Sequence, residues 1–446
     1  MNVAAQCARG QGGARRQLRL CKLPHGWQTD GVSKEILIVG AGAIGVCTAR
    51  YLAQRGHRVT VLERGAADRD GCSLGNAGMI VPSHFVPLAA PGMVALGLRW
   101  MWNPESPFYV KPRLDWELAA WAMKFWRAAT PAHVARCAPL IRDLSFASRA
   151  CFEELAAGED FGLVKRGLLM LCKTQHALDE EAKTAAQARA LGIPAEVLDA
   201  RQTAEREPGV RMDVAGAVYF PQDCHLTPAK FMAAMQRESE RAGVTFSHDT
   251  EVAGWRVNGR RIEAVRTNRG EFTADEYVIC GGSWSPGIAR DLRLALPMQA
   301  GKGYSLTLPA PRQLPQLCAI LSEARVAVTP MGGALRFGGT MEIAGLDESI
   351  NPRRIAGIVR AVPDYYPEFA PADFAGIQPW SGLRPCSPDG MPYVGRFGGY
   401  DNLATATGHA MMGLSLGPIT GRLMAEILSG EKPSHDIALL SPDRYA

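Results

Sequence analysis

Residues 34–63, KEILIVGAGAIGVCTARYLAQRGHRVTVLE, constrain the fold more than any other part of the chain. They predict a buried strand at 36–39, a glycine turn, a helix that ends at Arg55-Gly56, and a second strand at 57–62. Gly40, Gly42 and Gly45 have the spacing for a tight turn, a close approach of the backbone to a phosphate, and a helix–strand contact. The helix N-terminus, with Ala43 and Ile44, is therefore expected to bind a pyrophosphate.

Glu63 stands at the end of the second predicted strand, eighteen residues after Gly45. A carboxylate at this position accepts hydrogen bonds from ribose hydroxyls, and no arginine replaces it to suit a 2′-phosphate. A glycine-rich turn in an ordinary βαβ unit would explain the turn but not the acid. We therefore expect a bound dinucleotide, and these residues alone leave NAD and FAD both open.

The length of 446 residues favours two domains, and 47% hydrophobic with 21% charged residues is typical of a globular protein. Residues 1–34 hold six Lys/Arg and one acid, which gives this segment a charge of +5. The whole chain also has a net charge of +5, so the charges of the remaining residues balance. That balance argues against a nucleic-acid-binding protein with a basic surface. The leader lacks the apolar region of a secretory signal, and we expect a disordered extension over 1–33.

No apolar run is long enough to span a bilayer, since Val86–Leu98 is interrupted by Pro87 and Pro91. We expect a cytoplasmic protein, with peripheral contact with the inner membrane as an open alternative. The eleven cysteines show no CxxC pair or metal-ligand spacing, so we assign no metal. Cys47 and Cys280 are interpreted as small core residues.

Residues 71–78, GCSLGNAG, are dense in flexible and hydrogen-bonding residues. This composition predicts a second cofactor loop, with a plain surface loop as the alternative, and the expected contacts are Ser73, Asn76, Ala77 and Gly78. Further on, Trp121 and Phe125 have the i, i+4 spacing of a helix. Packing in the core is the favoured interpretation of this pair over contact with a membrane or a quinone.

The remaining pattern alternates between two kinds of sheet. A helix from Pro228 to about Ala242 precedes a predicted β-meander with turns at Asn258-Gly259 and Asn268–Gly270, and strand 277–280 ends at Gly281. Residues 382–395 are predicted to form a strand pair. A last helix is expected between Pro418 and Ser429-Gly430.

Taken in order, several motifs resemble the D-amino-acid oxidase superfamily of FAD enzymes, and most closely the bacterial D-amino-acid dehydrogenases and D-hydroxyproline dehydrogenases. They are GAGAIG with Glu63, SLGNAG, PLAAPGMVALGLRWM, GYS, GLRPCSPDGMPYVG and GHAMMGLSLGPITGRLMAEIL, within residues 34–434. The resemblance implies non-covalent FAD, with Val252 passing the adenine by its backbone. The further cofactor residues of the strand end and of the flavin loop are Gly281, Gly408, Met412, Gly413 and Leu414.

The implied fold class is α/β, with a Rossmann-like FAD-binding domain interleaved with an antiparallel-sheet α+β substrate domain. Segments 34–84, 222–292 and 380–434 are assigned to the FAD-binding domain, 85–221 and 293–379 to the substrate domain, and 435–446 to a tail. The loops at Pro82–His84 and Asp223–His225 are where relatives differ most. They leave the substrate side chain undetermined, with His84 and His225 as pocket candidates.

The implied reaction is hydride transfer from the α-carbon of a D-amino acid to flavin N5, with D-proline or cis-4-hydroxy-D-proline favoured by the likeness and a quinone as acceptor. Arg384 is our candidate clamp for the substrate carboxylate, because guanidinium is planar and bidentate. Tyr304 is either a second donor or a core residue, and His409 is either a tuner of the flavin, an acceptor of the amine proton or a structural residue. The open alternatives are a glycine- or sarcosine-oxidase-like enzyme that uses oxygen and a non-catalytic FAD subunit.

Overall fold

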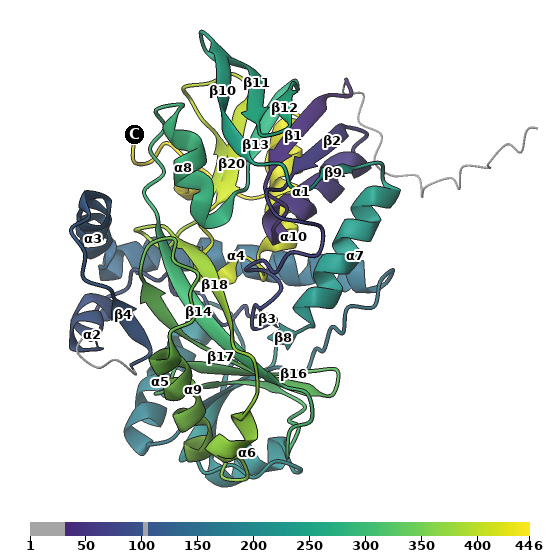
Figure 1. The fold of residues 1–446 in the computed structure, drawn as a ribbon. Helices are drawn as coiled ribbons and strands as arrows, with labels where there is room; N and C mark the ends of the chain where they lie inside the picture. The colour runs from purple at the N-terminus through teal and green to yellow at the C-terminus, as the bar shows by residue number, and fades with distance from the viewer. Residues whose placement is uncertain (1–31, 101–105) are drawn as a thin grey trace, which may run out of the picture. The chain divides into compact units, whose positions relative to one another are not determined.

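The computed structural model describes residues 32–100 and 106–446, so most of the predicted 1–33 leader, and Met101 at the end of the PLAAPGMVALGLRWM motif, lie outside the described residues. The stretch 34–63 forms the centre of a six-stranded sheet (Figure 1). All neighbouring strands in it are parallel except the β19–β20 pair, so the carboxyl ends of five strands share one edge. In spatial order the strands are β19 (Tyr393–Arg396), β20 (Leu403–Thr407), β13 (Glu276–Ile279), β1 (Glu35–Val39), β2 (Arg58–Leu62) and β9 (Thr245–Ser247).

Both faces of this sheet are covered, as the continuous apolar run of β1 requires. Ile36 and Ile38 pack toward α1 (Ala43–Gln54) and α10 (Gly417–Leu428), with α4 (Pro131–Ala156) and α7 (Pro228–Arg241) beyond them. Leu37 and Val39 pack toward the predicted meander and α8 (Ser285–Arg290). The meander strands are β10 (Val252–Asn258), β11 (Arg261–Thr267) and β12 (Gly270–Phe272).

A nine-stranded, mostly antiparallel sheet forms the second layer (Figure 1). Its order is β18 (Trp380–Cys386), β14 (Gln299–Leu308), β17 (Ala334–Ile343), β16 (Val326–Met331), β15 (Cys318–Leu321), β5 (Leu168–Cys172), β7 (Gly216–Phe220) and β6 (Glu196–Asp199), with β4 (Phe108–Val110) beside β17. Helices α5 (Gln175–Ala190), α6 (Ala200–Arg206) and α9 (Pro352–Tyr365) pack against it. The predicted fold class is confirmed.

The other elements connect or flank these layers. They are the pair β3 (Met79–Ile80) and β8 (Cys224–His225), the helices α2 (Met93–Trp100) and α3 (Trp116–Ala128), and the 3₁₀ turns η1 (Gly282–Trp284), η2 (Pro371–Phe374), η3 (Ala410–Met412) and η4 (Ala438–Leu440). Within the described ranges, no helix is both long and apolar enough to cross a membrane.

The strand pair predicted over residues 382–395 is wrong. β18 pairs with β14 of the large sheet, whereas β19 pairs with β20 of the six-stranded sheet. The connection 387–392, SPDGMP, contains two prolines, which cannot donate the backbone hydrogen bonds of a hairpin. The chain therefore crosses between the sheets inside segment 380–434, which the sequence analysis had assigned to one domain.

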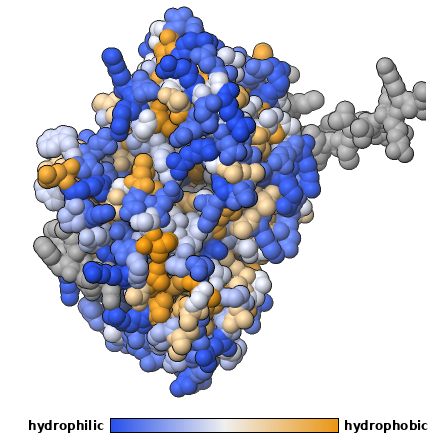
Figure 2. Space-filling view, in the orientation of Figure 1, coloured by the Kyte–Doolittle hydropathy of each residue, from blue (hydrophilic) through white to orange (hydrophobic). Residues whose placement is uncertain are grey.

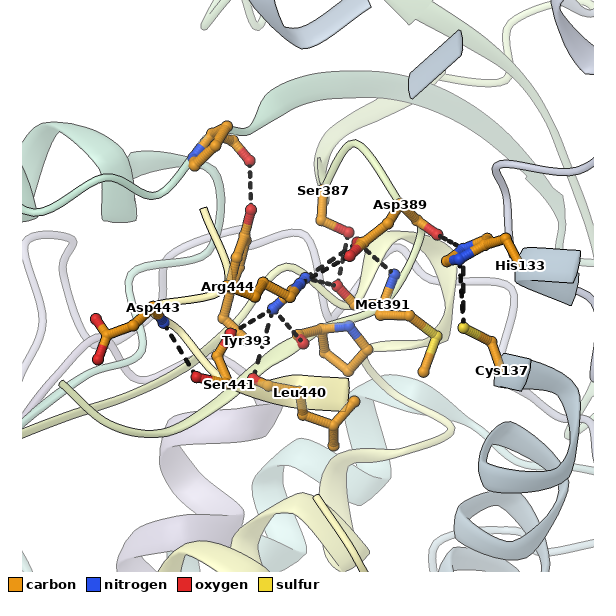
Figure 3. A network of polar contacts seen from close by, with 12 residues as sticks. His133, Cys137, Ser387, Asp389, Met391, Tyr393, Leu440, Ser441, Asp443 and Arg444 are labelled. Carbon is orange, nitrogen blue, oxygen red and sulfur yellow. Dashed lines mark hydrogen bonds and ion pairs between the residues drawn. The ribbon is translucent and has the colours of Figure 1, made fainter. Parts of the chain in front are cut away.

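The C-terminal segment holds the connection 387–392 in place through polar contacts (Figure 3). Arg444 forms an ion pair with Asp389 at 2.7 Å, donates to the carbonyl of Met391 at 2.6 Å, and lies 3.9 Å from the ring centroid of Tyr393. From α4, the imidazole Nε2 of His133 makes a hydrogen bond with the Asp389 carbonyl at 2.8 Å. Residues 435–446 thus pack on the fold although the sequence marks them only as a tail.

Candidate functional site

A cavity of about 1220 Å³ runs from the carboxyl ends of β1, β2 and β13 to the strands β14, β17 and β18 of the large sheet. It brings together all three predicted catalytic residues, Arg384, Tyr304 and His409. Most of the predicted cofactor residues also line it: Gly40, Gly42, Ala43, Ile44, Glu63, Ser73, Asn76, Ala77, Val252, Gly281, Met412, Gly413 and Leu414. Residues far apart in the sequence thus share one site at the edge of the parallel sheet, where such sheets bind ligands.

The other three predicted cofactor residues, Gly45, Gly78 and Gly408, allow backbone conformations or close approaches next to the cavity wall. A Cβ on Gly45 would lie 1.9 Å from the carbonyl oxygen of Gly40, so only glycine lets α1 approach the turn this closely. Gly78 and Gly408 have φ of 75° and 79°, in the left-handed region that favours glycine. None of the three lines the cavity, and their role in binding the cofactor stays a prediction.

The N-terminus of α1 is open to an anion. No side chain caps Gly42, and the first turn of the helix carries no acidic residue. A Cβ on Gly42 would meet the Ser73 hydroxyl at 3.7 Å, and no other atom of the described residues beyond the helix itself and the adjoining residues lies within 4 Å of that position. Ser73 Oγ accepts the Ala43 N–H at 3.0 Å, and this joins the second glycine loop to the first. The helix dipole and the remaining N–H groups of the first turn therefore suit a phosphate.

Glu63 is held beside this turn. Its carboxylate accepts the backbone N–H groups of Ala41 and Gly65, each at 2.9 Å, and lies 3.4 Å from Arg69. Two backbone donors and one cation leave lone pairs of the carboxylate for the hydroxyls of a sugar. Arg69 also lines the cavity, and the sequence analysis missed it because a lone arginine in a loop carries no signature.

The loop 71–78 is a wall of the cavity, not a plain surface loop. Asn76 Oδ1 accepts the Gly78 N–H at 2.8 Å. Arg336 of β17 donates to the carbonyls of Leu74 and Asn76 at 3.1 and 2.7 Å. The large sheet and the first glycine turn thereby hold the loop from two sides.

His409 supplies a test of whether a cofactor fits. Its Nε2 makes a hydrogen bond with Thr420 Oγ1 at 3.0 Å, while its buried Nδ1 has no partner among the described residues. Burial lowers the pKa of His409 to about 3, so the ring is neutral and suited to hydrogen bonding rather than to holding a proton. A buried, unpartnered nitrogen on a residue that lines the cavity fits a bound polar group.

Arg384 lies in the wall of the cavity, and its charge has no carboxylate partner among the described residues. Its Nη1 donates to the Thr340 carbonyl at 2.7 Å, and no carboxylate within the described ranges pairs with it. Burial lowers the pKa of the guanidinium. A desolvated charge is costly unless it is paired, so this position favours an anionic ligand.

Thr340 is a site residue that the sequence analysis missed. It has a φ of 62°, which is strained for a β-branched residue, at a register shift between β14 and β17. Its carbonyl holds Arg384, and its buried Oγ1 has no partner in the described part of the chain. A threonine in a strand is ordinary in a sequence, so no signal there could have identified it.

Tyr304 lies in the wall, but its hydroxyl donates to Glu342 at 2.6 Å. Burial, together with this carboxylate, raises the pKa of Tyr304. The single hydroxyl proton is therefore committed to Glu342 in this structure, and the side chain is 1% exposed. The geometry favours the core interpretation of Tyr304 over that of a second carboxylate donor.

A polar cluster adjoins the cavity at His84. Ser83 Oγ donates to Asp223 and contacts His84 Nδ1 at 3.1 Å. Burial raises the pKa of Asp223 to about 7, and burial with the nearby Arg325 lowers that of His84 to about 4. His84 and Arg325 line the cavity, whereas His225 does not and lies buried in β8.

The chain was compared with known proteins. Residues 35–427 match the model of the DAO family, described as FAD dependent oxidoreductase. A D-amino acid dehydrogenase of Granulibacter bethesdensis is 34% identical over 92% of this chain and 99% of the relative. Among solved structures, glycine oxidase from Geobacillus kaustophilus has a TM-score of 0.74 and 25% identity over 93% of this chain and 99% of its own. L-proline dehydrogenase from P. horikoshii has a TM-score of 0.70 at 17% identity, covering 93% and 98%, and shows likeness of fold alone.

Proposed function

The chain belongs to the DAO family of FAD-dependent oxidoreductases, and from this premise we propose that it oxidises D-amino acids as a dehydrogenase. The observation that carries the proposal is Arg384, a partly buried cation with no carboxylate partner among the described residues, in a cavity whose other end is formed by the Gly40–Gly45 turn and Glu63. Similarity over nearly the whole length to D-amino acid dehydrogenases gives the substrate class.

FAD would be held along the cavity by groups already described. The N-terminus of α1 at Gly42 would face the pyrophosphate, Glu63 the ribose, and the loop 71–78 the ring system. The orphaned Nδ1 of His409 would gain a hydrogen-bond partner. No covalent attachment is proposed: burial raises the pKa of Cys72, in the loop 71–78, to about 11, which keeps the thiol protonated.

The protein's part in the reaction is to hold the substrate. Arg384 would bind the α-carboxylate, and the carbonyl of Thr340 fixes the guanidinium against the large sheet. When bound, FAD supplies the acceptor for the hydride of the α-carbon. The imino acid would then leave the site and be hydrolysed to a 2-oxo acid. The neutral His409 adds no positive charge that would repel the substrate amine.

The substrate side chain would face the end of the cavity at His84 and Arg325. We favour D-proline or cis-4-hydroxy-D-proline on the resemblance of the motifs, and a quinone or dye rather than oxygen as acceptor. A cytoplasmic protein in peripheral contact with the membrane suits that acceptor.

A second candidate is an oxygen-using amine oxidase, favoured by the similarity in fold to glycine oxidase. The two functions differ in acceptor, so consumption of oxygen with formation of peroxide would support the oxidase. A non-catalytic FAD subunit is disfavoured, because it would have no carboxylate for Arg384 to hold.

The test is purification followed by anaerobic mixing with a panel of D- and L-amino acids. We expect a yellow protein that releases its flavin on acid precipitation and is bleached by D-isomers. Colour that stays in the pellet would refute the non-covalent cofactor. Bleaching by L-isomers alone would refute the stereochemistry.

A further inference from the structure

The cavity has an apolar arm that binding of an amino acid does not use. Met93, Val94 and Gly97 of α2, Phe108 of β4, and Trp121 and Phe125 of α3 line it. Its inner end reaches the core cluster of Trp121, Met341, Ile343 and Cys386, against which Ala410 packs. Ala410 follows His409, so the arm opens beside the proposed flavin ring.

The arm suits a flat apolar ligand. Trp121 stacks on Phe125 with 5.1 Å between the ring centroids. The indole N–H of Trp121 donates to the Cys386 carbonyl at 2.9 Å, so it is not free for a ligand. A zwitterionic amino acid would lose its hydration there without compensation, whereas a ring with an apolar tail would not.

The outer face of α3 carries an exposed apolar stripe. Trp116 and Trp126 are 87% and 61% exposed, and Met123 lies between them on the same side at 50%. Leu114, just before the helix, is fully exposed. Figure 2 shows apolar residues at the left edge of the molecule, where α3 lies. The opposite side of this helix, with Trp121 and Phe125, forms the arm.

Charge on this face fits an anionic lipid surface. Lys111 and Arg127 are exposed at either end of the stripe, while Glu117 is paired with Arg290 at 3.0 Å. Exposed tryptophans flanked by cations, on a helix that does not span the bilayer, are typical of a helix that lies in a membrane interface.

We propose that the apolar arm binds a lipid-soluble quinone, which enters from an anionic membrane surface on which α3 rests. The inference rests on the proposed dehydrogenase function and identifies where its electron acceptor binds. The quinone takes two electrons from the reduced cofactor and two protons, and it leaves as the quinol. No further oxidant is required for the balance.

The arm is tested with two matched substitutions on α3. Both Ala122 and Ala119 are exposed, but only Ala122 lines the cavity, and Ala119 lies about one turn before it on the same helix. In the flavin-loaded protein, Ala122→Trp should weaken calorimetric binding of decylubiquinone by at least about tenfold, and Ala119→Trp should leave it within about twofold. Equal binding by the two variants would overturn the assignment.

Electron transfer gives a second readout that does not use the amino acid. Bound flavin is reduced with dithionite and mixed with decylubiquinone or with ferricyanide. Ala122→Trp should slow oxidation by the quinone by at least about tenfold and oxidation by ferricyanide by less than about twofold. An equal loss with both acceptors would mean a damaged flavin site and would overturn the proposal.

The membrane surface is tested by sedimentation with vesicles of phosphatidylglycerol and phosphatidylethanolamine. The wild type should sediment with them, and the double variant Trp116→Ser/Trp126→Ser should not, whereas Val257→Ser, at an exposed valine of β10, should behave as wild type. If the wild type instead forms a dimer that the double variant dissociates, α3 is a contact between copies and the proposal fails. If D-amino acids fail to bleach the flavin while the dithionite assay behaves as expected, the proposed function fails and the quinone site stands.

Discussion

Replacing Arg384 by methionine separates a structural role of this residue from a substrate-binding one. Methionine keeps the length and the apolar stem of the side chain but removes the charge. In the free enzyme the guanidinium has one hydrogen bond to the protein, to the Thr340 carbonyl, and no carboxylate partner in the described ranges. The two roles therefore predict opposite effects on stability.

The magnitudes follow from these contacts. Loss of the hydrogen bond leaves one carbonyl unpaired, which costs about 1–3 kcal/mol. Removal of a partly desolvated, unpaired cation relieves part of a penalty that reaches several kcal/mol for a fully buried charge. We expect Arg384→Met to be at least as stable as the wild type, with an unchanged affinity for FAD. A clamp should meanwhile lose about 2–5 kcal/mol of transition-state stabilisation, which is roughly 30-fold to several-thousandfold in the efficiency of flavin reduction.

The assay is anaerobic stopped-flow reduction of the flavin by the best D-amino acid, together with thermal unfolding at saturating FAD. Arg384→Lys should recover part of the activity, because a point charge cannot reproduce the bidentate fork. Arg201→Met is the control, since Arg201 is an exposed arginine in a surface ion pair with Glu205. Reduction of Arg384→Met within about threefold of wild type, or less than about 0.7 kcal/mol, would show that Arg384 is not the clamp. A lowered melting temperature with normal reduction would make it a structural residue.

Three further predictions concern the fold and the cradle. Because the pKa of Asp223 is raised from 3.8 to about 7, the native state binds the proton more tightly, so urea stability should fall as the pH rises through this window. Asp223→Asn should flatten that dependence, and an equally steep profile in the variant would contradict the assignment. Arg444→Met should cost about 3–5 kcal/mol in urea unfolding at neutral pH, because Asp389 is left buried without its partner. Since Arg444 depresses the pKa of Asp389, this loss should shrink as the pH falls through the folded pKa, and a loss independent of pH would point to packing alone. Gly42→Val should fold, because its Cβ meets only Ser73 Oγ at 3.7 Å, yet bind FAD at least about tenfold more weakly in a flavin titration; retained affinity would remove Gly42 from the phosphate site.

The sequence was sufficient wherever the determining interactions are local. The apolar run at 36–39 forms a strand covered on both faces, and Gly40 takes a φ of 105° that only glycine adopts easily. Gly45 packs on Gly40 as its spacing predicted. Cys280 lies buried, and burial raises the pKa of its thiol to about 12, as expected of a core residue. These outcomes follow from backbone sterics and periodicity, which act within a few residues and leave a pattern in the chain.

The pairing of strands that are far apart in the chain left no such pattern in the sequence. Whether residues 382–395 formed a hairpin depended on the competing partners β14 and β20, which lie elsewhere in the chain. Trp121 and Trp126 look alike in sequence, yet one is 8% exposed and the other 61%, because only one faces the cavity.

The tertiary structure alone decided the electrostatics of the candidate site. Arg384 is a clamp candidate in the sequence by residue type, but the absence of a carboxylate partner in the described structure is a property of the assembled strands. The strained Thr340 that holds it, and the Glu342 that takes the proton of Tyr304, both come from β17. Charge pairing depends on distances of a few ångströms between residues remote in the chain, and composition, spacing and periodicity do not encode these distances.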